Sequence, residues 1–353
     1  VRFMVLQFYV EYLGADDGIN PPDPDVVARA YGTAVNSDVF SIFNGYVKHS
    51  DPLTMFQGNF GFDTIPFAPA DTSKRFLTNA PYREQTANYD DYGTLAFYQP
   101  TFTSAGFVHS FDIDYYGSDG IIIDTVNIRK RSVNGAFNTW TEKTEKHILF
   151  LGCFPGNLRN WSVPSNIPSA ALLEGGYILV SAVKDTGAQS IQPMRININC
   201  PETKNFEPIR LAWLNQWGAW DYYTFTKKST RTFKSKGTTY TQLGGTWNES
   251  TYKINSHRGG KKTFRVNSTE QIKINTDLIS EDFNDMFEDL SNSPEVYILK
   301  GYGYTTVLSA LNTYVTPVRI TSKNFIRKTR ANDRVIQYSF TIEKTKTLRT
   351  QSI

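Results

Sequence analysis

Strands are the elements that the hydrophobic pattern of this chain predicts most often. In the segment 107–115, Phe111, Ile113 and Tyr115 fall on one face of an extended chain, and Asp112 and Asp114 fall on the other. This period of two is typical of a half-buried strand. The Gly-Ser-Asp-Gly turn at 117–120 then predicts a hairpin over 107–130. Further strands are expected at 39–47, 94–98, 121–128, 147–151, 177–183, 194–199, 295–299, 314–320 and 335–343.

The arrangement of these strands predicts a mainly β chain with an N-terminal β-sandwich over residues 37–205. Clusters of Gly, Pro, Asn and Asp separate the strands, and the segments 71–81 and 84–91 are expected to be loops. A jelly-roll and an immunoglobulin-like topology both fit, and the spacing leaves that choice open. Residues 1–36 are expected to form an opening strand or arm followed by a proline-rich linker at 18–25.

A second β-rich domain is predicted over residues 206–353, and it opens with the segment 209–225. This segment holds three of the six tryptophans of the chain. Its apolar spacing fits both a strand and one face of a helix, but Gly218 argues against a long helix because glycine costs about 1 kcal/mol in a helix interior. We therefore expect two strands joined by a tight turn at 215–218.

The rest of the second domain is predicted to contain long polar hairpins and one short amphipathic helix. Turns are expected at 235–237, 244–245 and 259–260, where Gly and Ser interrupt a run of Thr, Lys, Arg and Tyr. Over 280–290, apolar residues at helical spacing predict a helix with an acidic first turn. Ser280 is the expected N-cap of this helix.

Charge is unevenly distributed, although the formal net charge is only +3. Residues 1–226 carry 16 basic and 23 acidic residues, whereas residues 227–273 carry 11 basic and two acidic residues. A solvated or self-neutralising hairpin is the favoured interpretation, with a contact to an acidic protein surface as an alternative. Nucleic acid ranks lower, because no recognised RNA- or DNA-binding signature accompanies the basic residues.

Catalytic and metal-binding motifs do not emerge from the sequence. The four histidines, His49, His109, His147 and His257, lack metal-ligand spacing, and the segment 112–123 departs from a calcium loop at two ligand positions. Two cysteines, Cys153 and Cys200, make neither a disulfide framework nor a metal cluster. We predict a non-enzyme without cofactor or metal and without a membrane span, although a pair of glycosidase carboxylates would leave no local motif.

Two groups of residues are the candidate sites. The aromatic group is expected in the core of the second domain or at an interface, and the basic group on a surface that contacts partners. The aromatic group is Trp213, Trp217, Trp220, Tyr222, Tyr223 and Phe225. The basic group is Lys227, Lys228, Arg231, Lys234, Lys236, Arg258, Lys261, Lys262 and Arg265.

The aromatic segment 210–225 resembles a recurrent segment in structural proteins of tailed bacteriophages, many of them from Bacteroidetes hosts. The order that follows is also similar: basic hairpins, an acidic helix at 280–290, and the segments 293–299, 316–320 and 335–343. The segments 75–81 and 93–97 resemble the first body of the same proteins. The resemblance covers most of the chain beyond residue 37, and its motifs are structural.

This resemblance implies a virion component of the tail, neck or baseplate that is present in several symmetric copies. Its partners would be copies of itself and other virion proteins. A ring or sleeve could bring the acidic body of one copy against the basic segment of the next. The alternative is a receptor- or glycan-binding tail adhesin that uses exposed aromatic side chains.

Overall fold

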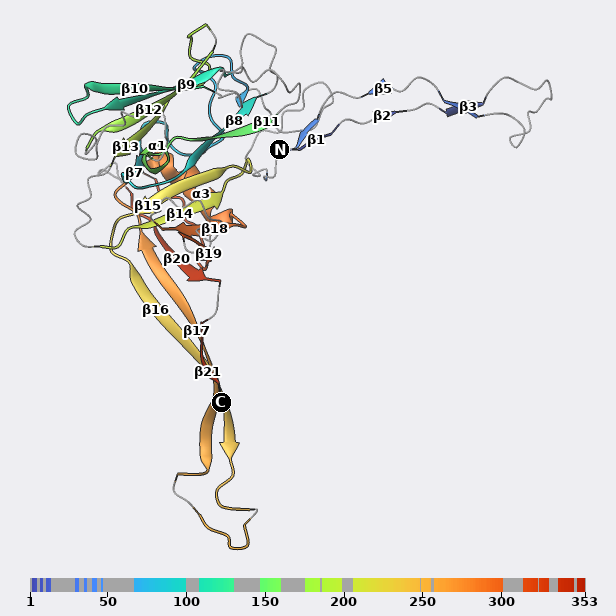
Figure 1. Ribbon diagram of the computed structural model, residues 1–353, viewed down its shortest axis with the longest axis vertical. Helices are drawn as coiled ribbons and strands as arrows, with labels where there is room; N and C mark the ends of the chain where they lie inside the picture. The colour runs from blue at the N-terminus through green and yellow to red at the C-terminus, as the bar shows by residue number, and fades with distance from the viewer. Residues whose placement is uncertain are drawn as a thin grey trace, which may run out of the picture.

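The structure is a computed structural model of the 353-residue chain. It describes residues 2–4, 7–8, 11–13, 29–31, 35–36, 40–42, 46, 67–99, 108–129, 147–159, 175–184, 186–198, 206–247, 249–254, 257–300, 314–322, 324–329, 336–345 and 348–352. Within these residues the fold is mainly β with several sheets, as predicted (Figure 1). The proline-rich segment 18–25, the predicted domain boundary near 205 and the polar turn before 335 lie outside the described residues.

The first strands of the chain form a paired ribbon. The pairs are antiparallel: β1 (Arg2–Met4) with β6 (Phe40–Ile42), β2 (Gln7–Phe8) with β5 (Val35–Asn36), and β3 (Glu11–Leu13) with β4 (Arg29–Tyr31). Strands β2, β3, β4 and β5 lie well away from the large sheets (Figure 1). Phe40–Ile42, which falls in the strand predicted at 39–47, therefore belongs to this ribbon through its partner β1.

A five-stranded sheet follows, with the order β10-β9-β12-β13-β7. Its strands are β7 (Gln85–Ala87), β9 (Ser110–Tyr116), β10 (Ile122–Arg129), β12 (Tyr177–Val183) and β13 (Met194–Ile198). The predicted hairpin over 107–130 is confirmed by the antiparallel pairing of β9 with β10 and by the positive φ of Gly120. The expectation that 84–91 is a loop was wrong, because Gln85–Ala87 pairs in parallel with Ile196–Ile198 at the sheet edge. Because this strand is short and polar, its sequence shows no apolar alternation, and it forms through pairing with its neighbour β13.

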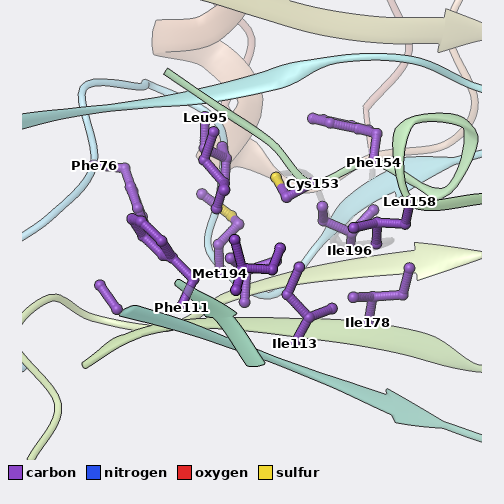
Figure 2. Close-up of a cluster of buried hydrophobic side chains, with 14 of the residues drawn as sticks. Phe76, Leu95, Phe111, Ile113, Cys153, Phe154, Leu158, Ile178, Met194 and Ile196 are labelled. Carbon is purple, nitrogen blue, oxygen red and sulfur yellow. The ribbon is translucent and has the colours of Figure 1, made fainter. Parts of the chain in front are cut away.

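The first core lies between this sheet and the pair β8 (Thr94–Gln99) and β11 (His147–Gly152). Phe111 and Ile113 from β9 pack there with Ile178 from β12 and Met194 from β13 (Figure 2). Leu95, Cys153, Phe154 and Leu158 close the other side. Phe154 directly precedes the short helix α1 (Pro155–Arg159), and Leu158 lies within it. Cys153 is a buried free thiol whose pKa is raised by that burial, whereas Cys200 lies outside the described residues.

The second large sheet has eight strands in the order β15-β14-β18-β19-β20-β17-β16, with β21 paired to β17. Its strands are β14 (Ile209–Leu214), β15 (Trp220–Phe225), β16 (Thr230–Gln242), β17 (Gly260–Asn275), β18 (Val296–Leu299), β19 (Val315–Ile320), β20 (Ser339–Lys344) and β21 (Leu348–Ser352). Strand β21 was not predicted from the sequence. The strand predicted at 335–343 begins later, at Ser339, and Ile336 forms an isolated bridge with Ile279.

The predicted amphipathic helix is confirmed, with a different start. A 3-10 turn, η2 (Glu281–Phe283), leads into α3 (Asn284–Asn292). Its buried stripe contains Phe283, Met286, Phe287 and Leu290, as expected. Ser280 is the N-cap of η2, as predicted, but its side chain accepts no capping hydrogen bond from the helix, and its hydroxyl donates to the Glu84 carboxylate.

The segment 226–276 is one hairpin, not several. The turn expected at 235–237 was wrong: Gly237 lies within β16 and pairs with Val266. The residues on either side of Gly237 are also paired, Lys236 with Asn267 and Thr238 with Arg265, and the register shifts only beyond Thr238. The loop at the end is bounded by glycines of positive φ, Gly245, Gly259 and Gly260, in agreement with the other two expected turns.

Candidate interaction surfaces

The tryptophan-rich segment is a β-hairpin with both faces buried. Strands β14 and β15 pair antiparallel, and Gly218 has a φ of 73° in the tight turn between them, as predicted. The Asn215 side chain holds this turn: its Oδ1 accepts from the Trp217 amide at 3.1 Å and the Ala219 amide at 3.0 Å, and its Nδ2 donates to the Leu77 carbonyl at 2.9 Å. The turn is therefore tied to the segment 67–83 of the preceding part of the chain.

Each face of this hairpin belongs to a different core. Leu211, Trp213 and Phe225 lie in the second core, while Ala212 and Tyr222 lie in the first. Opposite residues of an antiparallel pair share a face, so the register separates the two sets. The hairpin is thus the element that the two cores share.

The candidate aromatic residues are all used in packing to a large extent. Trp213 is fully buried and lies 6.5 Å from Phe287, measured between ring centroids, and Trp217 is buried 5.1 Å from Phe67. Trp220 is half-buried and meets Tyr297 edge to face at 5.8 Å. Tyr222, Tyr223 and Phe225 are buried, and burial raises the pKa of both tyrosines. These rings form core and seam, and they leave little aromatic surface for a ligand.

A buried ion pair anchors the hairpin to the first core. The Arg210 Nη1 lies 3.2 Å from Asp91 Oδ2, and the Arg210 Nε donates to the Tyr92 carbonyl at 2.9 Å. The guanidinium also lies 4.9 Å from the ring centroid of Phe154 and 5.2 Å from that of Tyr222. Burial lowers the pKa of Arg210, and the Asp91 carboxylate opposes that shift.

Two carboxylates occupy the opposite face of the hairpin, toward α3. Asp221 is buried and accepts hydrogen bonds from the Thr78 hydroxyl and, at 3.3 Å, from the Asn79 amide. The neighbouring Asp289 accepts from Asn79 Nδ2 at 2.6 Å and from the Tyr46 hydroxyl at 2.8 Å. Desolvation raises the pKa of Asp221 to about 7, and the charge of Asp289 adds to that shift. Among the described residues, no Lys or Arg forms an ion pair with Asp221.

The candidate basic residues lie on the β16–β17 hairpin or at its ends. This hairpin extends far beyond the other strands of its sheet (Figure 1), and 12 of the 13 residues of β16 are exposed. Two of the nine cations form ion pairs near the base: Lys227 with Asp277 at 2.9 Å, and Arg231 with Glu207 and Glu270. In the described part of the chain, the other seven form no ion pair: Lys228, Lys234, Lys236, Arg258, Lys261, Lys262 and Arg265.

The loop at the end of the hairpin presents apolar side chains in an ordered frame. Trp247 is 67% exposed and meets Tyr252 edge to face, with ring centroids 5.3 Å apart. The Thr246 hydroxyl donates to the Thr251 carbonyl at 3.1 Å and accepts from the Lys253 amide at 2.9 Å. A Cβ on Gly245 would lie 2.3 Å from the Tyr252 ring, so this contact requires glycine. Leu243 and Ile254 are also exposed, at 70% and 78%.

The described residues contain neither a candidate metal site nor a helix that could span a membrane. Among the described residues, no three His, Cys, Asp or Glu side chains come close enough to hold a metal ion. No helix in the same residues is long and apolar enough to cross a membrane.

Comparison of the chain with protein-family models, with curated proteins and with solved structures finds no match.

Sequence reasoning missed the polar residues that hold the aromatic hairpin. Arg210 and Asp221 are the two charged residues in the otherwise apolar segment 209–225, and that contrast was an available signal. The ion-pair partner of Arg210 is Asp91, and the hydrogen-bond donors to Asp221 are Thr78 and Asn79. All three lie far away along the chain, and no local pattern identifies them.

Proposed function

We propose that this chain is a non-enzymatic virion structural protein of a tailed bacteriophage, which builds a multimeric ring or sleeve in the tail, neck or baseplate through contacts between copies. The observation that carries this proposal is the projecting β16–β17 hairpin, whose distal part is exposed on both faces. A lone two-stranded ribbon is marginally stable in water, so a ribbon of this length is best explained by a surface that covers it in an assembly.

Two further features support assembly from copies of the same chain. The ribbon of β1 to β6 is a second projecting element, and it leaves the body in a different direction from the β16–β17 hairpin (Figure 1). Charge is also complementary, because the residues up to 226 are net acidic and the hairpin segment is net basic. Contacts between two different surfaces close into a ring when the rotation between neighbours allows it. We further propose that the first sheets form a sandwich of jelly-roll or immunoglobulin-like type.

Self-association tests this function directly. The full chain is expected to form one closed oligomer in sedimentation velocity at low salt, and a variant in which residues 239–264 are replaced by a two-residue Asn-Gly turn between the paired Thr238 and Arg265 is expected to sediment as a monomer. That pair of results would identify the distal part of the β16–β17 hairpin as the contact between copies. A wild-type chain that stays monomeric at high concentration and low salt would refute the proposal. Circular dichroism of the shortened variant verifies that its sheets still form.

A tail adhesin is the second candidate function, and the exposed Trp247–Tyr252 ring pair favours it. Aromatic rings in a fixed frame can stack on sugar rings or insert into a receptor. Replacing Trp247 with Ala is expected to reduce binding to host cells or surface glycans at least about tenfold while the oligomer persists, since hot-spot tryptophans contribute about 2 kcal/mol or more. Leu278, 66% exposed and outside the hairpin, is the matched site for a control replacement by Ala. Unchanged binding by the Trp247→Ala variant would exclude the ring pair as a binding site.

A further inference from the structure

We propose that one face of the β16–β17 hairpin binds the phosphodiester backbone of single-stranded nucleic acid. This inference does not depend on the proposed virion role. It follows from the strand register, which places on one face four cations that form no ion pair within the described residues.

Four cations occupy successive positions on that face. Residues opposite each other in an antiparallel pair lie on the same side of the sheet, and positions two apart along a strand also share a side. The register pairs Lys234 with Thr269, Lys236 with Asn267, Thr238 with Arg265, and Tyr240 with Lys262. Each of these four cross-strand pairs thus contributes one cation to the same face. We call Lys234, Lys236, Arg265 and Lys262 the cation row.

The opposite face of the same stretch carries no cation. Its paired residues are Phe233 with Glu270, Ser235 with Ser268, Gly237 with Val266, and Thr239 with Thr263. The cations next to this stretch on the opposite face are Arg231, which is paired with Glu207 and Glu270, and Lys261, which lies opposite Thr241. Lysine that served only to prevent edge pairing would not need to be confined to one face within the stretch. The segregation therefore indicates a partner that approaches from one side.

The charges of the cation row are available to such a partner. In the described part of the chain, none of the four forms an ion pair, although Lys262 Nζ donates to the His257 carbonyl at 3.4 Å and Arg265 Nε donates to Asn267 Oδ1 at 3.0 Å. Three of them are exposed and Lys262 is half-buried. Glu343, an acid on the same face, is engaged by Gln271 at 2.7 Å and by Arg319 at 2.7 Å. These hydrogen bonds are the main cause of its lowered pKa, and the charge of Lys234 adds to it.

The spacing of the row fits a linear polyanion. Two residues of an extended strand span about 6.7 Å, so the row presents one positive charge per step of that length. This repeat is of the same order as the separation of successive phosphates along a polynucleotide strand. Tyr240 shares the last position with Lys262 and can stack on a base, which is the combination that single-strand binders use.

An acidic protein surface is the competing partner. In the described residues, the outer side of η2 and α3 carries Glu281, Asp282, Asp285 and Glu288, and Arg327 already pairs with Asp285 and Glu288. On β9, Asp112 and Asp114 already accept hydrogen bonds from Asn127 and from the Thr125 hydroxyl. Competition with polyglutamate distinguishes an acidic polypeptide from a phosphodiester backbone.

Fluorescence anisotropy with a labelled oligodeoxythymidine tests the proposal on the full chain. Neutralising four phosphates predicts a log–log salt slope of about −3, which corresponds to roughly 50-fold weaker binding when salt rises from about 50 to about 200 mM. The variant K234Q/K236Q/R265Q/K262Q is expected to bind at least about tenfold more weakly at the lower salt and to lose most of the slope. The control variant K228Q/K253Q/R258Q/K261Q removes the same charge outside the row and is expected to keep both affinity and slope.

Three results would overturn the proposal: no binding by the wild type at the lower salt, equal losses in the two variants, or displacement of the oligonucleotide by polyglutamate at the same charge concentration. The last result would show that the row takes acidic polypeptides. Circular dichroism of both variants verifies that a loss of binding is not a loss of fold.

Discussion

Replacing Asp91 with alanine is expected to lower the free energy of unfolding by about 3–5 kcal/mol, because it leaves a buried guanidinium without its counter-charge. The Arg210 side chain is 5% exposed, and Asp91 is its ion-pair partner at 3.2 Å. Asp91 Oδ2 also accepts a hydrogen bond from the Thr224 hydroxyl at 2.7 Å, so the buried Thr224 hydroxyl loses this acceptor in the variant. Urea unfolding followed by tryptophan fluorescence measures the change.

The control for this prediction is an ion pair between an Asp and an Arg that are both exposed at the surface. Asp285 pairs with Arg327, and both side chains are more than half exposed. Asp285→Ala is expected to cost at most about 1 kcal/mol. The double variant Asp91→Leu/Arg210→Met should recover a large part of the lost stability, since it removes the charge together with its partner. If Asp91→Ala and Asp285→Ala cost the same, the buried pair does not hold the hairpin.

The second large effect is the pH dependence conferred by Asp221. Its pKa is raised from 3.8 to about 7 in the folded protein, chiefly by desolvation. The folded state therefore binds more protons than the unfolded state between about pH 4 and pH 7, and this residue makes the protein less stable as pH rises through that window. A shift of this size corresponds to a destabilisation on the order of 4 kcal/mol above pH 7.

Asp221→Asn removes this ionisation and is the variant to compare. Its stability minus that of the wild type is expected to increase as pH rises from about 4.5 to about 8, whatever constant offset the new amide introduces. Thermal unfolding at several pH values measures that difference. A difference between Asp221→Asn and the wild type that stays flat over this range would contradict the assignment.

The sequence predicted the strands that carry a clear period of two, and it missed those that do not. Strand β9 and the segment around β20 alternate apolar and polar residues, and both were located correctly to within a few residues. Strand β7, only Gln85–Ala87, has no such alternation and exists because β13 offers it a partner. Glycine is common in turns, so the sequence predicted a turn at Gly237. The residue instead lies in β16, because it pairs with Val266 of β17. Composition therefore predicted the fold class, whereas strand β7 and the position of Gly237 depend on long-range pairing.

The residues of the two candidate sites could be predicted from the sequence, but the faces that their side chains occupy could not. The aromatic and basic residues stood out in the sequence, because both kinds are concentrated in short segments. Which face each side chain occupies depends on register, and register is set by pairing across the hairpin and by one irregularity between Thr238 and Thr239. The division of the aromatic hairpin between two cores depends in the same way on what packs against each side. Neither is encoded in a local pattern.

The register shift in the β16–β17 ladder marks a place where the arm changes direction. Thr238 pairs with Arg265 and Thr239 pairs with Thr263, so β17 uses one residue more than β16 at this level. A bulge of this kind bends the strand that carries it and increases the local twist. The loop with Trp247 is therefore presented at an angle that differs from that of the root of the arm, where the hairpin joins the sheet.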